Sequence, residues 1–196
     1  MSATATTIKE RELNSMSLLT AGVVLATVTM TFGAMIAVFL VRANDSKYWG
    51  HIELPGILWL TTAVLLASTV TLEFSRRALA ANDQPRAFRA FSWTAGLGLA
   101  FLGGQLIAWW QVLHSGVVLA RNPHSWFIFL FTALHGVHIL LGLAGLGYLV
   151  ARTREAVTGP KYLMKTRVVA NGVSVFWHYL DFLWIVLFGL LLLWRR

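Results

Sequence analysis

Five long apolar stretches constrain the fold of this 196-residue chain more than any other feature. They cover approximately residues 17–41, 55–72, 90–113, 126–151 and 173–194. A helix needs about 20 mostly apolar residues to cross about 30 Å of hydrocarbon, and the segments between these stretches are too short to form a soluble domain. We therefore predict an all-α polytopic membrane protein. A polar N-terminal tail at residues 1–16 precedes a bundle of five transmembrane helices at residues 17–196.

Lys and Arg residues are distributed unevenly between the two predicted sides of the membrane. The N-terminal tail and the segments 76–89 and 152–167 hold eleven of the 16 basic residues, and the opposite side holds the other five. Because basic loops remain on the cytoplasmic side, we predict that the N-terminus lies inside and the C-terminus outside. This bias and an affinity for anionic headgroups explain the net charge of +8 without a nucleic-acid partner. Trp49, Trp126 and Trp194 fall near the predicted outer surface, as in an aromatic belt.

Small and hydroxyl-bearing residues indicate where the helices pack together. Gly96, Ala100 and Gly104 recur at four-residue intervals in the third stretch, a pattern that lets helix backbones approach closely in membranes. Gly136 in the fourth stretch is expected to serve the same purpose. Thr62 and Thr69 share one face of the second stretch, which predicts a helix contact.

Histidine and aspartate side chains lie inside the last two apolar stretches. An aspartate at the centre of a lipid-facing helix costs roughly 2.5–3.5 kcal/mol on insertion scales, so Asp181 must face protein, water or a partner. His178 lies three residues before it on the same helix face. With His135 and His138 of the fourth stretch, these residues are predicted to form a structural polar network joined by hydrogen bonds between helices.

A haem or metal site, a proton relay and a b-type cytochrome are the alternative interpretations of these histidines. At about 1.5 Å per residue, His138 lies about 20 Å and His178 about 10 Å from the inner ends of their helices, which is a poor match for one shared haem. The chain has no cysteine, which excludes thiolate-ligated clusters. A small proton-coupled transporter would need more intramembrane carboxylates than Glu73 and Asp181. We predict no catalytic, cofactor-binding or metal-binding residue in this chain.

Three segments carry a resemblance to a known family. The run Phe176–Trp184 (FWHYLDFLW) resembles the last-helix signature of haem–copper oxidase subunit III. The run Leu134–His138 (LHGVH) is similar to the histidine–glycine motif of the preceding helix, and Leu60–Ser68 resembles the first long helix after the outer loop. The matches occur in the family's order, and five spans correspond to the short bacterial form, which lacks the first two helices of the seven-helix type.

The resemblance implies a non-catalytic accessory subunit of a cytochrome c or quinol oxidase. It implies that haem and copper lie in partner subunits, that this chain binds phospholipid in a cleft, and that it contacts catalytic subunit I and other oxidase subunits. It also implies a multi-pass protein of the bacterial cytoplasmic (inner) membrane with possible support of proton uptake. A subunit III-like protein of a nitric oxide reductase system remains an alternative. Ala26–Thr31, Leu106–Ala108 and Asn171 lack carboxylates common in the family, which puts a role in proton collection in doubt.

Overall fold

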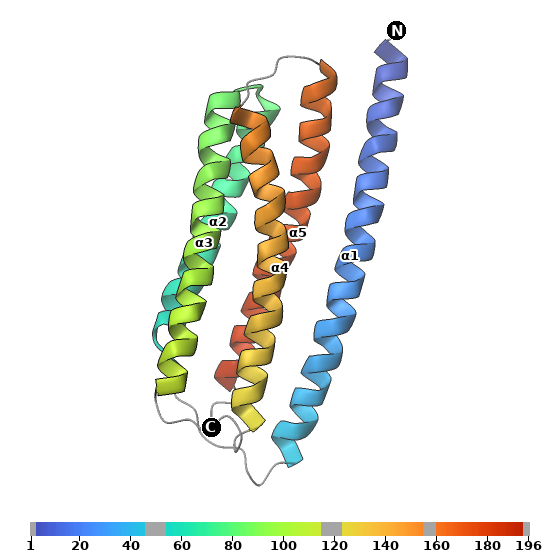
Figure 1. The fold of residues 1–196 in the computed structure, drawn as a ribbon. Helices are drawn as coiled ribbons and strands as arrows, with labels where there is room; N and C mark the ends of the chain where they lie inside the picture. The colour runs from blue at the N-terminus through green and yellow to red at the C-terminus, as the bar shows by residue number, and fades with distance from the viewer. Residues whose placement is uncertain (1–2, 46–53, 115–122, 155–159, 194–196) are drawn as a thin grey trace.

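A computed structural model of the chain describes residues 3–45, 54–114, 123–154 and 160–193. The described residues form five helices and no strand, and each helix is long and apolar enough to cross a membrane. The predicted all-α, five-span fold is therefore confirmed (Figure 1). The helices are α1 (Ala3–Asp45), α2 (Ile57–Ala80), α3 (Gln84–His114), α4 (Pro123–Arg154) and α5 (Pro160–Leu193).

The helices extend beyond the apolar stretches that predict them. Helix α1 begins at Ala3, inside the segment expected to be a polar tail, and α5 begins at Pro160, before the apolar stretch at residues 173–194. Hydropathy marks only the part of a helix that lies in hydrocarbon, whereas the backbone hydrogen bonds continue into the interface. Proline suits the first helical position of α4 and α5 because its missing N–H would have no intrahelical acceptor there.

Helices α2, α3, α4 and α5 surround one hydrophobic core, and α1 lies at the edge of this bundle (Figure 1). Helix α1 contacts only α4 and α5 among the described helices. Its buried side chains Val28, Phe32 and Phe39 pack in a second apolar cluster with residues of α4 and α5. The core therefore belongs mainly to the last four helices.

Trp177 of α5 occupies the centre of the four-helix core and is fully buried. A Cβ atom on Gly98 of α3 would lie 2.8 Å from its ring, and a Cβ atom on Gly142 of α4 would lie 2.9 Å from it. The indole N–H donates a hydrogen bond to the Ser68 hydroxyl of α2 at 3.0 Å. One side chain thus contacts three neighbouring helices, and the two glycines provide the space for its ring.

A tight turn joins α2 to α3 through a complete helix cap. Asn82 has φ of 60°, in the left-handed region that asparagine tolerates better than most residues. The Asn82 and Asp83 N–H groups donate to the carbonyl oxygens of Leu79 and Ala78, the pattern of a Schellman motif. The Asp83 carboxylate then accepts a bond from the Arg86 N–H at 3.1 Å, capping the start of α3. The turn fixes α2 and α3 as an antiparallel pair.

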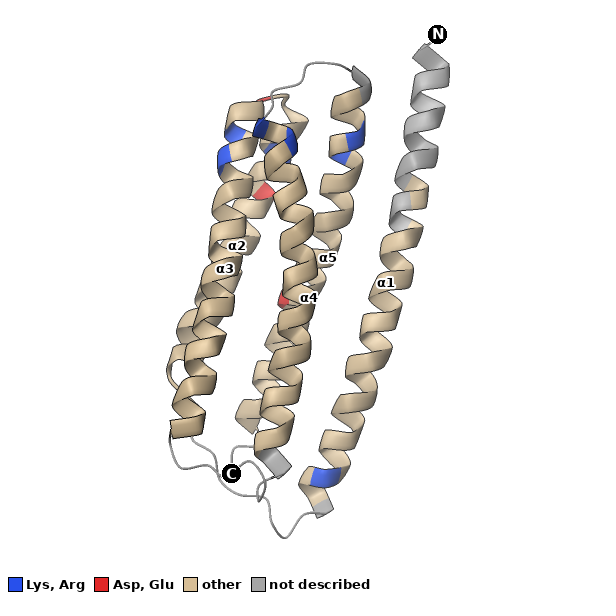
Figure 2. Ribbon diagram, in the orientation of Figure 1, with Lys and Arg blue, Asp and Glu red and all other residues tan. Residues whose placement is uncertain are grey.

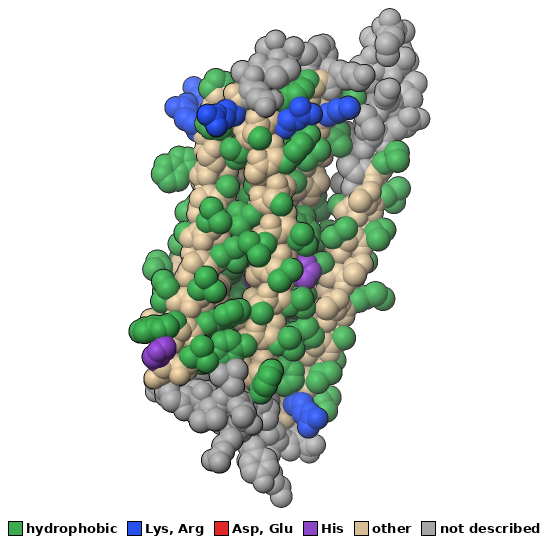
Figure 3. All heavy atoms as spheres, viewed as in Figure 1, with side chains coloured by type: hydrophobic (Ala, Val, Ile, Leu, Met, Phe, Trp, Pro, Cys, Tyr) green, Lys and Arg blue, Asp and Glu red, His purple; other side chains and the backbone are tan. Residues whose placement is uncertain are grey.

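Basic side chains gather at one end of the bundle and apolar side chains cover its flanks. Figure 2 shows described Lys and Arg residues of α2 to α5 at this basic end, whereas Arg42 of α1 lies near the opposite end. Figure 3 shows apolar side chains over the face between the two ends, as lipid contact requires. Which end faces the cytoplasm stays a prediction from the charge bias. Trp126 and Trp110 are exposed, whereas Trp49 and Trp194 lie outside the described residues.

Candidate functional site

Hydroxyl groups on one side of α2 bind polar side chains of α5. The Trp184 indole N–H donates to the Thr62 hydroxyl at 3.0 Å, and the Thr69 hydroxyl donates to the Asp181 carboxylate. With the bond from Trp177 to Ser68, three hydrogen bonds that involve α2 hydroxyl groups join the two antiparallel helices. The helix contact that Thr62 and Thr69 predict is therefore present, and its partner is α5.

Asp181 is buried at 4% exposure and binds a threonine of α2. The sequence interpretation gave it a histidine partner from α4 or α5, but none of its hydrogen bonds in the described part of the chain goes to a histidine. The difference arises because Asp181 lies on the side of α5 that faces α2 rather than α4. Its second carboxylate oxygen is buried and accepts no hydrogen bond from the described residues.

The three intramembrane histidines lie in three separate places. His135 is fully buried between Phe101 and Trp184, with ring centroids 5.8 and 5.2 Å away, and neither ring nitrogen has a hydrogen-bond partner among the described residues. His138 uses Nδ1 in a 2.7 Å contact with the Leu134 carbonyl oxygen, one turn earlier on α4. No hydrogen bond joins either of them to His178 or Asp181 within the described ranges.

His178 faces a shallow groove between α2 and α5, on the flank of the bundle. The groove has a volume of about 320 Å³ and is lined by Thr69, Val70, Glu73, Phe74, Arg77 and His178. The Glu73 carboxylate binds Arg76 at 3.0 Å and Arg77 at 3.1 Å, one turn further along α2. Thr69 lines this groove and also binds Asp181, which does not line it.

The predicted stripe of small residues on α3 does not lie along a single contact. Gly104 packs closely against Thr61 of α2, but Gly96 and Ala100 are exposed. Each four-residue step exceeds the 3.6-residue turn and rotates by about 40°, so the stripe winds away from α2 over two steps. Gly136 lies beside the Leu102 side chain, since a Cβ atom added to Gly136 would lie 3.7 Å from a Leu102 methyl group. Gly96 and Ala100 remain available to lipid or to another protein.

Close approach within the chain also depends on glycines that the sequence interpretation did not select as packing residues. Gly98 and Gly142 accommodate Trp177, and a Cβ atom on Gly145 would lie 2.8 Å from a Val173 methyl group. Gln105 was also overlooked: its amide donates to the Thr61 hydroxyl at 3.3 Å between α3 and α2. The glycine-rich run of α4 was the available signal, because three glycines between residues 142 and 147 are unusual in a helix.

Helix α1 is joined to α5 by a pair of hydroxyl groups. The Thr29 hydroxyl lies 2.6 Å from the Tyr179 hydroxyl. Thr29 belongs to the segment Ala26–Thr31, where the resemblance implies a carboxylate that this chain lacks. A neutral hydrogen bond between α1 and α5 thus lies in this segment.

An apolar groove separates the first part of α1 from α4 and α5. Its volume is about 450 Å³. The lining residues are Thr20, Ala21 and Val24 of α1, Leu141, Gly142 and Gly145 of α4, and Val168, Val169, Gly172, Val173 and Phe176 of α5. Three of these residues are glycines, and at Gly172 nothing lies within 4 Å of an added Cβ atom. Its shape and lining suit a hydrocarbon chain.

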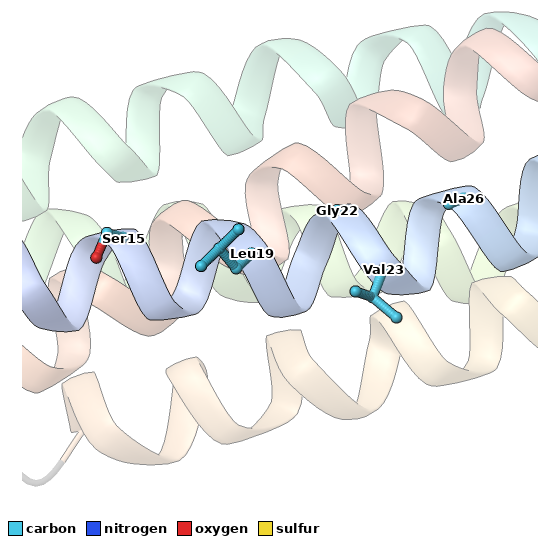
Figure 4. A pocket seen from close by; sticks show the side chains of 5 residues that line it. All are labelled: Ser15, Leu19, Gly22, Val23 and Ala26. Atoms are coloured by element: carbon cyan, nitrogen blue, oxygen red, sulfur yellow. The ribbon is translucent and has the colours of Figure 1, made fainter.

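A second hollow runs along α1 itself. Figure 4 shows its lining residues Ser15, Leu19, Gly22, Val23 and Ala26, all from this one helix. The absence of a side chain at Gly22 contributes to the hollow, since nothing lies within 4 Å of an added Cβ atom there. This part of α1 therefore presents an uneven apolar surface.

Comparisons with known proteins find relatives that match most of the chain. Residues 49–196 match a family model described as cytochrome c oxidase subunit III. The chain is 28% identical over 173 residues to cytochrome c oxidase subunit 3 of Thermostichus vulcanus, covering 86% of this chain and 82% of that protein. It is 30% identical over 166 residues to cytochrome c oxidase subunit 3 of Corynebacterium diphtheriae, covering 81% and 78%. A probable cytochrome c oxidase subunit 3 of Nocardia farcinica is 27% identical over 191 residues, covering 94% and 92%.

Proposed function

The chain belongs to the cytochrome c oxidase subunit III family, and we propose that it stabilises the catalytic subunit of a haem–copper terminal oxidase through helix packing and bound lipid. Its partners are then catalytic subunit I and other oxidase subunits, in the bacterial cytoplasmic membrane. The multi-pass membrane character is shown by the five helices and the family. The stabilising role, the lipid and the individual partners are the proposed part.

The apolar groove between α1, α4 and α5 is the observation that carries this proposal. It opens in the part of the bundle that lies in hydrocarbon, and its lining is almost entirely apolar. Lys165 is exposed one turn before Val168 on α5, where an ammonium group can meet a lipid headgroup. A phospholipid with one acyl chain in the groove fits both features.

Redox chemistry is assigned to partner subunits rather than to this chain. The separation of His135, His138 and His178 into three environments supports this assignment, because a helix-pair haem site needs two imidazoles that face each other. The purified chain is expected to show no haem absorption and no stoichiometric copper or iron. A Soret band corresponding to one haem per chain would instead identify it as a cytochrome.

Deleting the chain from the oxidase tests the stabilising role. We expect the haem content of the catalytic subunit to be retained, while its lifetime during sustained turnover, its lipid content or its assembly yield falls. Since Thr29 stands in the segment where a carboxylate is expected, durability should suffer more than the initial rate of proton uptake. Unchanged durability, lipid content and yield would contradict the proposal.

A groove-filling variant tests the lipid within the intact complex. Gly172 lines the groove, and a Cβ atom there would meet nothing within 4 Å, so Gly172→Leu is designed to place a side chain in the groove. We expect it to lower the number of lipids that co-purify with the complex and to shorten its lifetime in turnover. Gly147→Leu is the matched control, because Gly147 is equally open and does not line this groove. Equal lipid content in the two variants would show that the lipid does not bind in this groove.

A further inference from the structure

A small polar cavity lies between α2 and α5 at the basic end of the bundle. Its volume is about 180 Å³, about six times the ~30 Å³ that one water molecule occupies in the liquid. The cavity is lined by Arg76, Leu79, Ala80, Arg167, Ala170 and Asn171. It shares no lining residue with the apolar groove beside α1.

Arg76 reaches this cavity from α2, and its Nε donor is unused among the described residues. Its guanidinium group donates to the Glu73 carboxylate at 3.0 Å and to the Asn171 side-chain oxygen at 3.3 Å. Its Nε atom is buried and has no acceptor among the described residues. A buried charged N–H without an acceptor is unfavourable, so this donor favours an anion in the cavity.

Arg167 reaches the same cavity from α5, and its bonded partners are all uncharged. One terminal nitrogen donates to the carbonyl oxygens of Leu79 and Ala80 and to the Asn82 side-chain oxygen, at 3.4, 3.0 and 3.0 Å. Its Nε atom is also buried without an acceptor in the described part of the chain. The positive charge of Arg167 is therefore not balanced by any carboxylate that the structure shows bound to it.

The described carboxylates nearby are already bound to arginines other than Arg167. Both oxygens of Glu73 bind Arg76 and Arg77. Asp83, beyond the end of α2, binds Arg86 at 3.1 Å. Glu73 is thus shared by Arg76 and Arg77, and Arg167 binds only uncharged partners, which leaves an excess of positive charge at the cavity.

We propose that this cavity binds a phosphate group, with Arg76 and Arg167 as the two arginine ligands. Guanidinium groups match the geometry of phosphate oxygens, and a phosphate has enough oxygens to accept from both Nε atoms at once. The cavity lies at the end where basic residues gather, the level at which phospholipid headgroups lie. The phosphate belongs to an anionic lipid headgroup or is free inorganic phosphate. The site does not depend on assembly with an oxidase, so it stands apart from the proposed function.

Titration of the delipidated full chain in detergent distinguishes the two sources. Phosphatidylglycerol and phosphatidylcholine are added separately and the bound lipid is counted by native mass spectrometry, while inorganic phosphate is titrated calorimetrically. We expect phosphatidylglycerol to bind at least tenfold more tightly than phosphatidylcholine. If inorganic phosphate binds and displaces phosphatidylglycerol, the site recognises the phosphate group itself, which also supports the proposal.

Charge variants connect the binding to the cavity. Arg167→Gln and Arg76→Gln should each lower phosphatidylglycerol or phosphate binding at least tenfold. Arg89→Gln is the matched control, because Arg89 is an exposed arginine at the same end that does not line the cavity. Binding that falls equally in all three variants would reflect net charge alone and would overturn the proposal.

A steric variant keeps the test valid if loss of either arginine disturbs folding. Ala80 is exposed and lines the cavity, so Ala80→Leu narrows it while both arginines remain. We expect reduced binding in Ala80→Leu and wild-type binding in Ala151→Leu, an exposed alanine of α4 outside the cavity. Wild-type binding in Ala80→Leu together with Arg76→Gln would overturn the proposed site.

Discussion

The Thr69 hydroxyl of α2 donates a hydrogen bond to the Asp181 carboxylate of α5. This bond satisfies one oxygen of a buried acidic side chain in the middle of a membrane-spanning helix. Trp184 and Trp177, on the same helix, bind Thr62 and Ser68 of α2. The α2–α5 interface therefore pairs several polar groups that lipid could not solvate.

Asp181 should tolerate an amide better than an apolar side chain. Asp181→Asn keeps an oxygen that accepts from Thr69, whereas Asp181→Leu removes it. Interhelical hydrogen bonds in membranes contribute about 0.6 kcal/mol on average and up to about 1.7 kcal/mol. Unfolding in mixed micelles, measured as a double-mutant cycle of Asp181→Leu with Thr69→Val, should give a coupling energy in this range. A coupling energy of zero would contradict the contact.

His135 should be replaceable by an apolar residue. Its ring is enclosed by Phe101 and Trp184, and its nitrogens have no partner among the described residues. A buried donor or acceptor without a partner costs about 1–3 kcal/mol, so removing the unpaired nitrogens offsets the loss of ring contacts. His135→Leu should therefore change the free energy of unfolding by less than about 1 kcal/mol. A loss above about 2 kcal/mol would show that the imidazole is hydrogen-bonded.

Gly142 should not accept even one additional carbon. An added Cβ atom would lie 2.9 Å from the rigid, fully buried ring of Trp177. Overpacking of this kind costs about 1–3 kcal/mol, so Gly142→Ala should lower the free energy of unfolding in mixed micelles by that amount. Gly147→Ala, where nothing lies within 4 Å, should leave it unchanged or raise it slightly.

The α2–α3 turn should prefer glycine to alanine at position 82. Asn82→Gly and Asn82→Ala both lose the side-chain oxygen that accepts from Arg167. They differ in the left-handed backbone at φ 60°, which costs about 1–2 kcal/mol for a residue with a Cβ atom. Thermal unfolding of the two variants should thus rank glycine above alanine by about 1 kcal/mol. The reverse order would place residue 82 outside the left-handed region.

Single cysteines should report the orientation without background, because the chain has none of its own. Ala81 lies at the basic end and His114 at the opposite end of α3, and both are exposed. From the positive-inside rule, an impermeant thiol reagent should label Ala81→Cys only from the cytoplasmic side and His114→Cys only from the other side. The opposite labelling would invert the predicted topology.

Hydropathy is sufficient to predict the five helices, because each must bury about 20 apolar residues in hydrocarbon whatever its neighbours are. It does not predict the rotation of each helix about its own axis, which depends on contacts between helices. Asp181 shows this difference. Its depth and burial follow from the sequence, but its partner Thr69 follows from the side of α5 that faces α2.

The small residues of α3 illustrate the same limit. A four-residue spacing predicts that Gly96, Ala100 and Gly104 share a contact, but the spacing drifts around the helix and only Gly104 packs closely within the chain. Gly98 lies between two members of this stripe and contacts Trp177 instead. The position of the Trp177 ring determines that glycine is needed at residue 98. Because Trp177 lies on α5, the sequence of α3 alone does not predict this contact.

The hydroxyl groups of α2 have a consequence for biosynthesis. Thr62 and Ser68 each donate to a carbonyl oxygen of their own helix, at 2.7 and 2.6 Å. These two donors are therefore satisfied in the bilayer before α5 packs against α2. The Asp181 carboxylate has no hydrogen bond within α5, so moving it from the translocon into lipid carries the largest free-energy cost. Because α2 is synthesised first, Thr69 is already in the membrane when Asp181 emerges from the ribosome. We expect α5 to leave the translocon against α2 rather than alone, which makes the insertion of the last helix dependent on the second.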